Sequence, residues 1–349
     1  MKLRLLQSGV FYAITAAILF GASTPLSKAL LGQATPWMLA GLLYLGSGLG
    51  LFIIQSIKKS STEANLQHTD WLWLGGAILA GGIVAPVLMM FGLSHTQSVI
   101  ASLLLNLEGV LTALIAWFVF REHFDQRIAM GMGAITAGSV LLSWQGRPDF
   151  DGNWGFMAIV AACLGWAVDN NLTRKVSATD PMQIAILKGC VAGIVNIAIA
   201  LTIGDKFPNL LTIGSIGLVG FLGYGISLVL FVLALRYIGT SRTGAYFSMA
   251  PFVGAAIAIV FFKEPITTNL LFASGLMAIG VWLHLTEDHE HEHSHEAIIH
   301  EHSHTHDEHH QHEHLGNISS LKAHSHPHQH QTIQHKHRHY PDIHHRHSH

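Results

Sequence analysis

Glu108 is an ionisable residue in the middle of a long apolar segment, residues 97–120. A charged side chain in the core of a bilayer is energetically costly, so such residues usually serve a function. Glu108 is the twelfth of these 24 residues, near the predicted midplane. Desolvation there favours the neutral carboxyl, which can exchange a proton near neutral pH. We expect Glu108 and its neighbour Asn106 to contact a solute or couple its movement to a proton. The alternative is a neutral glutamate that is hydrogen-bonded to a neighbouring helix.

Asp169 and Lys188 are a second pair of charged residues within apolar segments. Asp169 precedes Arg174 by five residues at the end of one segment, and Lys188 lies about six residues into the next. At about 1.5 Å per helical residue, both would lie roughly 8–9 Å below the same membrane surface. Asn170 and Asn171 add amide groups beside the carboxylate. We expect either a structural ion pair between two helices or a gate beside a cavity.

Imidazole groups dominate the end of the chain, residues 287–349. Only four of the 27 histidines precede this tail. Most rings are neutral at pH 7, and imidazole binds Zn, Ni, Cu and Co ions. The first half of the tail contains the candidate metal ligands His289, His291, His293, His295, His302, His304, His306, His309, His310, His312 and His314.

The tail is of low complexity and has no apolar face, so it is predicted to be disordered. Three roles remain open for it. It could store or sense metal for an exporter, it could act as a pH-sensitive charged brush, or it could be a tolerated extension. No bound cofactor is required in any of these cases, since transition metals would bind the tail reversibly.

Composition excludes most soluble classes. The chain has 349 residues, of which 50% are hydrophobic and only 11% charged, against about 25% charged in ordinary soluble domains. The two cysteines, Cys163 and Cys190, lie in apolar runs and make no disulfide framework. There is no G-x-x-x-x-G-K-[ST] motif and no hydrolytic or redox constellation. The sequence therefore predicts neither an enzyme nor a nucleic-acid-binding protein.

The elements that carry these residues are long apolar segments, each near the 20 residues that a membrane helix needs. We predict ten membrane-spanning helices at about 9–31, 36–57, 71–93, 97–120, 128–145, 154–173, 182–204, 210–235, 240–262 and 269–286. Pro25, Pro86 and Pro251 lie inside spans, where kinks or helix breaks are expected. The fold class is therefore an all-α polytopic membrane protein.

The positive charges of the connecting segments predict the orientation. With a cytoplasmic N-terminus, ten cations lie inside: Lys2, Arg4, Lys58, Lys59, Arg121, Arg127, Arg174, Lys175, Arg236 and Arg242. Four lie outside: Lys28, Arg147, Lys206 and Lys263. Both ends of the chain, and hence the histidine-rich tail, are predicted to be cytoplasmic.

The two halves of the apolar region resemble each other. Residues 92–138 align without gaps to the sequence 142 residues later, which places Glu122 on Glu264. We interpret both glutamates as architectural, at the junction between one helix and the next. Each half holds five spans, and because five is odd the second half must be inverted. The predicted units are 1–147, 148–286 and the tail 287–349.

Two stretches carry a resemblance to a known family. They are ASLLLNLEGVLTALIAWFVFREHFDQRIAMGMGAITAGSVLL (101–142) and GAYFSMAPFVGAAIAIVFFKEPITTNLLFASGLMAIGVWL (244–283). Each has a long apolar span, a terminal glutamate, a short polar turn and a final span with spaced glycines. Both resemble the closing helices of an EamA repeat in the drug/metabolite transporter superfamily. The resemblance implies ten helices, a bacterial plasma (inner) membrane and export or uptake of a small solute.

These observations predict a secondary transporter that works by alternating access, with proton exchange through Glu108. The expected solute is an amino acid or a related metabolite. One alternative is efflux of a divalent transition metal with the tail as its sensor or capture segment. Another is a membrane-anchored metal buffer without transport. The expected partners are the lipid bilayer and the solute, and the sequence leaves a homodimer open.

Overall fold

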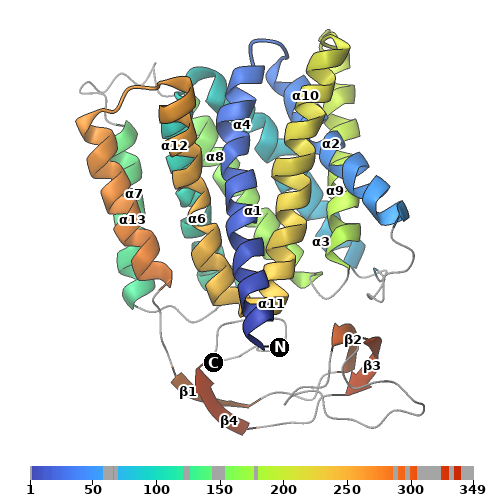
Figure 1. Ribbon diagram of the computed structural model, residues 1–349, viewed down its shortest axis with the longest axis vertical. Helices are drawn as coiled ribbons and strands as arrows, with labels where there is room; N and C mark the ends of the chain where they lie inside the picture. The colour runs from blue at the N-terminus through green and yellow to red at the C-terminus, as the bar shows by residue number, and fades with distance from the viewer. Residues whose placement is uncertain are drawn as a thin grey trace.

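The computed structural model describes residues 2–57, 66, 70–120, 126–143, 154–176 and 180–285, with four short segments of the tail. The helices, in chain order, are α1 (Lys2–Leu30), α2 (Pro36–Ile57), α3 (Asp70–Ala77), η1 (Ile78–Val84), α4 (Ala85–His95), α5 (Ser98–Leu104), α6 (Asn106–Phe120), α7 (Gln126–Ser143), α8 (Trp154–Lys175), α9 (Pro181–Thr202), α10 (Leu210–Gly220), η3 (Phe221–Ile226), α11 (Ser227–Phe247), α12 (Ala250–Phe262) and α13 (Thr268–Leu285). They form a bundle in which α1 begins and α13 ends at the same end (Figure 1).

Seven helical segments in the described residues are long and apolar enough to cross a membrane, and three more are apolar but shorter. Three of the long segments are composite. α3, η1 and α4 make up Asp70–His95, α5 and α6 make up Ser98–Val119, and α10, η3 and the start of α11 make up Leu210–Ala234. Each predicted span overlaps one of these segments, but the ninth, predicted at 240–262, begins only at Ala250, because α11 continues from Ser227 to Phe247. The all-helical membrane architecture is therefore as predicted, while the ten-span count remains a prediction because three helices are short.

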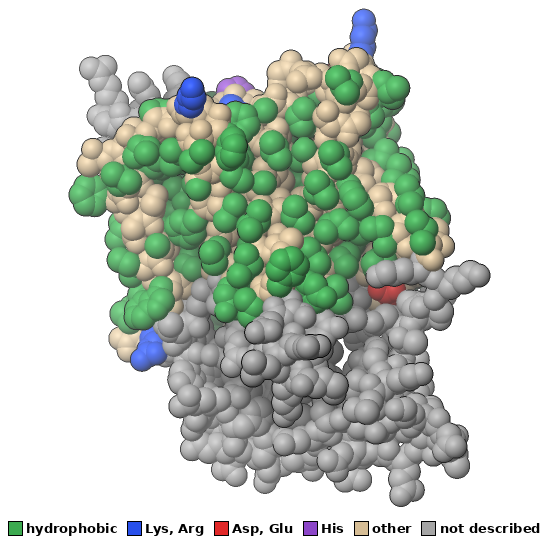
Figure 2. Space-filling model, in the orientation of Figure 1, with side chains coloured by type: hydrophobic (Ala, Val, Ile, Leu, Met, Phe, Trp, Pro, Cys, Tyr) green, Lys and Arg blue, Asp and Glu red, His purple; other side chains and the backbone are tan. Residues whose placement is uncertain are grey.

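The outer surface of the bundle is apolar. Large side chains such as Leu72, Leu210 and Leu211 are more than 80% exposed. In Figure 2 hydrophobic side chains cover the side of the bundle, and the visible Lys and Arg side chains lie at its two ends. A surface of this kind suits contact with the hydrocarbon core of a bilayer.

Helices at corresponding positions in the two halves pack against each other. α2 packs against α9, and α7 packs against α13. Glycines permit the first contact, since a Cβ added to Gly189 would lie 2.6 Å from the backbone nitrogen of Gly48. α1 packs on α11 and α12, and α8 packs in the same way on α4 and α6. Each half therefore contributes equivalent surfaces to one shared interior.

Pro86 contributes to the interruption of the third apolar segment. Proline has no N–H to donate, so a carbonyl in the preceding turn loses its helical partner. The backbone here widens into the π-helical segment η1, and the N–H of Ala85 bonds to the carbonyl of Ala80, five residues earlier. A second π-helical segment, η3, occurs about 143 residues later at the corresponding place in the other half. The break predicted at Pro86 is thus a π-helical segment. Pro251 lies in the first turn of α12, which begins at Ala250.

Side chains from three other helices bond the carbonyls near this break. Tyr44 Oη donates to Gly81 O at 2.8 Å, and Trp166 Nε1 donates to the same oxygen at 3.0 Å. Asn196 Nδ2 donates to Gly82 O at 3.2 Å. Non-helical backbone within a membrane needs such partners, because lipid supplies none. The packing of α2, α8 and α9 therefore fixes η1.

Tyr44→Phe should lower stability only modestly. The substitution removes one donor to Gly81 O, but Trp166 continues to bond the same oxygen. We expect a loss of about 0.5–1.5 kcal/mol in unfolding free energy, the usual contribution of one hydrogen bond. Thermal unfolding in detergent measures this, and a loss several times larger would mean that the phenol does more than satisfy one carbonyl.

Four short strands are described within the tail. β1 (Glu290–Ser294) pairs antiparallel with β4 (Gln334–Arg338), and β2 (Ile299–His304) pairs antiparallel with β3 (His324–Gln329). The disorder predicted for residues 287–349 remains a prediction. The His-x-His alternation of these four segments has the two-residue period of an extended strand.

Candidate functional site

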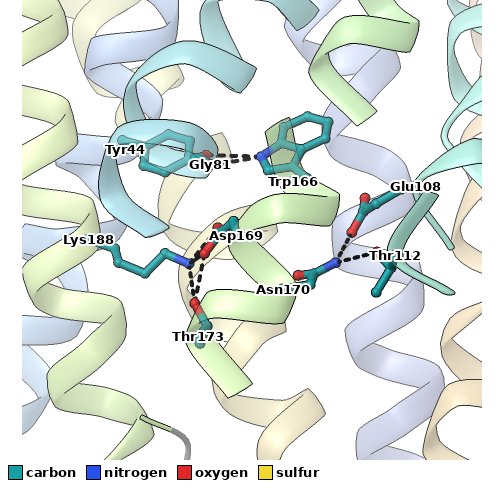
Figure 3. A network of polar contacts seen from close by, with 9 residues as sticks. All are labelled: Tyr44, Gly81, Glu108, Thr112, Trp166, Asp169, Asn170, Thr173 and Lys188. Atoms are coloured by element: carbon teal, nitrogen blue, oxygen red, sulfur yellow. Dashed lines mark hydrogen bonds and ion pairs between the residues drawn. The ribbon is translucent and has the colours of Figure 1, made fainter. Parts of the chain in front are cut away.

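Polar side chains from α6, α8 and α9 face one another within the bundle (Figure 3). They form two groups: an ion pair between α8 and α9, and a carboxyl–amide contact between α6 and α8. Asp169 and Asn170 are neighbours on α8, so this helix contributes to both groups. Consecutive helical residues point about 100° apart, which is why α8 can reach α9 and α6 at the same level.

The ion pair joins Asp169 to Lys188. Lys188 Nζ lies 2.6 Å from both carboxylate oxygens. Thr173, one turn further along α8, donates to Asp169 Oδ1 at 2.7 Å and accepts from Lys188 Nζ at 3.4 Å. The side chains of Lys188 and Asp169 are only 15% and 7% exposed. Asp169 and Lys188 were predicted to lie at the same depth, and in the structure their side chains form an ion pair in which the two charges neutralise each other.

Gly81 of η1 makes room for this pair. A Cβ on Gly81 would lie 2.0 Å from Asp169 Oδ2, closer than any side chain could tolerate. The carboxylate therefore lies directly against the backbone of η1. Trp166, one turn before Asn170 on α8, bonds the carbonyl of the same glycine. The position of η1 and the position of the ion pair consequently depend on each other.

Glu108 contacts Asn170 across the two halves of the chain. Asn170 Nδ2 donates to Glu108 Oε1 at 2.8 Å and lies 3.4 Å from Thr112 Oγ1. Glu108 lies in the first turn of α6, just after the helix is interrupted at Leu105. The sequence suggested an uninterrupted span here. The break instead places the carboxyl at a helix start, where the helix dipole favours negative charge.

Asn170 is exposed, although it lies away from the apolar outer side of α8. The exposed apolar residues of this helix include Met157 and Leu164. At about 100° per residue, Asn170 lies roughly 120° around the helix from Leu164 and roughly 140° from Met157. Its exposed surface is therefore on the side of α8 that contacts α6. A solute that reached this side would meet the amide and the half-buried carboxyl of Glu108 together.

Asn106 does not join this group. It is buried, and its Nδ2 donates to Leu103 O at 2.9 Å and lies 4.0 Å from Met277 Sδ. Asn171 also bonds backbone, donating to Ala167 O at 2.9 Å and to Thr112 O at 3.2 Å. The side chains of Asn106 and Asn171 thus bond backbone carbonyls, whereas the Asn170 side chain bonds the carboxyl of Glu108.

Glu264 bonds the start of another helix, α5, and the sequence did not predict these partners. Its carboxylate accepts the backbone N–H groups of Ser98 at 2.9 Å and Val99 at 2.8 Å, and also the Ser98 hydroxyl. It therefore caps α5 of the first half from the second half. Thr267 caps the following helix by accepting the Leu270 N–H at 3.2 Å. Glu122 lies outside the described residues.

Sequence reasoning missed Tyr44, Trp166, Thr112 and Thr173. Helical spacing could have indicated two of them, because Trp166 is four residues before Asn170 and Thr173 is four residues after Asp169. Residues with that spacing share a helix face. Nothing comparable in the sequence connects Tyr44 or Thr112 to α8, since those contacts depend on how the helices pack.

The described residues contain no group of three or more His, Cys, Asp or Glu side chains that could hold a metal ion. Of the candidate tail ligands, His291, His293, His302 and His304 belong to the backbone of β1 and β2. The remaining candidates lie outside the described residues. The metal sites predicted for the tail therefore stay predictions.

Comparison with known proteins identifies the family. The EamA-like transporter family matches residues 7–144 and again residues 153–286. An uncharacterised transporter of Methanothermobacter thermautotrophicus is 30% identical over 295 residues, covering 79% of this chain and 85% of that protein. A solved crystal structure has a TM-score of 0.61 at 17% identity and covers 80% of this chain and 98% of its own; it supports the fold alone.

Two further relatives have more specific names. A probable 4-amino-4-deoxy-L-arabinose-phosphoundecaprenol flippase subunit, ArnE of Pseudomonas fluorescens, is 34% identical over 30% of this chain and 89% of its own. The S-adenosylmethionine/S-adenosylhomocysteine transporter of Chlamydia muridarum is 24% identical over 80% of this chain and 92% of its own. Family and relatives indicate a transporter rather than an enzyme. The chain belongs to the EamA-like transporter family, which confirms the resemblance seen in its sequence, and it is an integral membrane transporter of small solutes.

Proposed function

We propose that this protein moves an amino acid or a related metabolite across the plasma membrane by alternating access, with proton exchange at Glu108. The observation that carries the proposal is the contact between Glu108 and Asn170. This contact joins a carboxyl of the first half to an amide of the second, and Asn170 is exposed on the side of α8 that contacts α6. A site between two repeats is where secondary transporters bind their solutes.

The repeat architecture supports alternating access. The family matches the chain twice, and corresponding helices of the two matched regions pack against each other. We propose two five-helix units, residues 1–147 and 148–286, with opposite orientations in the membrane. In such a pair, one unit can rock against the other while the site between them stays in place. Both termini would then lie in the cytoplasm, as the loop cations predict.

The charges near the site support a solute with an amino group. Lys188 is already paired with Asp169, whereas Glu108 bonds only a neutral amide among the described contacts. An ionised Glu108 can therefore bind a positively charged or hydrogen-bond-donating group. The two relatives with named solutes agree with this chemistry, because one name contains an amino sugar and the other a derivative of the amino acid methionine.

Uptake into inverted membrane vesicles tests this function. A panel of radiolabelled amino acids, amino sugars and nucleoside derivatives would be offered to vesicles with the intact protein, with Glu108→Gln, or with empty membrane. We expect a pH gradient to drive uptake of at least one solute by the intact protein only. If no solute with an amino group enters the vesicles faster than it enters empty membranes, the proposed solute class is contradicted.

The histidine-rich tail favours metal binding as a second activity, separate from the transported solute. It holds 23 of the chain's 27 histidines. Because the described residues offer no group of three metal-binding side chains, the tail is the candidate place for Ni²⁺ or Zn²⁺. A regulatory or storage role would leave the solute site unchanged.

Deleting residues 287–349 should separate the two activities. We expect the truncated protein to lose most of its Ni²⁺ and Zn²⁺ binding in calorimetric titration, because imidazole is the preferred nitrogen ligand of both ions. Uptake of the solute in metal-free buffer should be unchanged. If the truncated protein kept its metal affinity, or if cells expressing it lost metal tolerance together with solute transport, the separation would be refuted.

A further inference from the structure

Polar contacts join four of the interhelical connections at one end of the bundle, those that lie among the described residues. Lys28 Nζ, near the end of α1, donates to Leu93 O at 2.5 Å and to Ser94 O at 3.3 Å, at the end of α4. Three further contacts pair a residue of the first half with one of the second: Thr35 with Asp205, Gln33 with Thr212, and Ser98 with Glu264. The loop cations predict that this end faces outward.

Glu264 makes the most extensive of these contacts. Its two carboxylate oxygens accept two backbone N–H groups and one hydroxyl, all in the first turn of α5. The first N–H groups of a helix have no partner within that helix. Hydrogen bonds to a charged acceptor are also roughly twice as strong as neutral ones. This one side chain therefore fastens the start of α5 to the loop after α12.

The backbone after α12 directs Glu264 toward α5. Lys263 has a left-handed conformation with φ 54°, and it is the one non-glycine residue with positive φ among the described residues. The N–H groups of Lys263 and Glu264 both bond back to Ala258 O, the latter at 3.3 Å, and these bonds close the end of α12. Because the helix end is fixed in this way, Glu264 moves together with α12.

Beneath this contact, α5 packs tightly against α12. A Cβ on Gly254 would lie 2.7 Å from Ser102 Oγ and 2.7 Å from Gly21 O, so α12, α5 and α1 meet there. Ser102 is only 1% exposed, and its hydroxyl has no hydrogen-bond partner. Ser102 lies one turn below Ser98. It would become accessible if α5 separated from α12.

We propose that Glu264 is a releasable latch that holds this end of the transporter shut. In the latched state, Glu264 of the second half holds α5 of the first half by hydrogen bonds to Ser98 and Val99. Opening at this end requires these hydrogen bonds to break so that α5 can separate from α12. The proposal rests on the alternating access proposed above, but it does not depend on the solute or on proton exchange at Glu108.

Thiol labelling tests the latch without a known solute. In a protein carrying Cys163→Ala and Cys190→Ala, Ser102→Cys serves as the reporter, and a membrane-impermeant maleimide is added to either side of sealed vesicles. Glu264→Gln replaces an acceptor oxygen by an NH₂ group that faces N–H donors. We expect labelling from the latch side to become about tenfold faster, the change that loss of one hydrogen bond to a charged group produces.

Asp180→Asn is the matched control. Asp180 also caps a helix start, by accepting the Met182 N–H at 2.9 Å, but it does so within its own half. Its substitution should leave labelling unchanged. Ser98→Ala, which removes only the hydroxyl donor, should give a smaller increase than Glu264→Gln, and it provides the test if Glu264→Gln fails to fold.

Two results would overturn the latch. The first is that Glu264→Gln and Ser98→Ala both leave labelling of the reporter as slow as it is without these substitutions. The other is labelling that rises as much with Asp180→Asn, since this would show general loosening. Glu108→Gln should not change labelling, so a failed transport proposal would not be mistaken for a failed latch.

Discussion

Glu108→Gln should abolish the response of solute uptake to a pH gradient while the protein remains folded. Glutamine can still bond Asn170, so the contact between α6 and α8 survives, but it cannot bind or release a proton. We therefore expect the variant to accumulate the same amount of solute with and without the gradient, whereas the intact protein accumulates more solute when the gradient is present. Uptake measured at several pH gradients in vesicles gives the value.

Asn106→Ala is the matched control for Glu108→Gln. Asn106 is two residues away in the same turn, but it bonds only Leu103 O and approaches Met277. Its loss should change stability slightly and leave the pH response intact. If both variants lost the response equally, or if neither did, the carboxyl of Glu108 would not be the coupling group.

Asp169→Asn and Lys188→Met should each destabilise the protein severely. Either change leaves one buried charge without its partner, with an expected loss of about 3–5 kcal/mol in unfolding free energy. The double variant removes both charges, so it should recover most of this loss. Thermal unfolding of the four proteins in detergent forms a double-mutant cycle that measures the coupling.

The same cycle distinguishes the two roles that the sequence left open for the ion pair. A structural pair predicts that the double variant transports solute at nearly the normal rate once it is folded. A gate predicts a folded but inactive double variant. Because Asp169 and Lys188 are fully paired and η1 lies against the carboxylate, we expect the structural result. Additive losses in the double variant would contradict the interaction itself.

Sequence patterns were sufficient for the helical membrane architecture, because long uncharged segments admit few other structures. Charge and depth were also enough to pair Asp169 with Lys188, although α8 and α9 come together mainly by packing on η1 rather than on each other. The alignment also singled out Glu264, whose carboxylate bonds the start of α5 in the structure. Periodicity could not show its partner, because Ser98 lies 166 residues away in the chain.

The details of the site depend on three-dimensional packing that no local pattern encodes. Asn170 and Asn171 look alike in sequence, yet only Asn170 meets Glu108, because a rotation of about 100° per residue turns Asn171 toward backbone. The interruption of the helix at Leu105 could not be predicted from the sequence either, since no proline lies there. Pro86, in contrast, marked a break in advance, but its π-helical form required Tyr44, Trp166 and Asn196 to bond the freed carbonyls.

Simultaneous recording of solute and proton flux in proteoliposomes containing purified protein is the most direct test of the central claim. With a solute identified from the vesicle panel and no imposed pH gradient, the intact protein should move protons in step with the solute. The Glu108→Gln protein should move none. Solute flux without any proton movement in the intact protein, or equal proton movement in both proteins, would contradict a transporter whose coupling resides at Glu108.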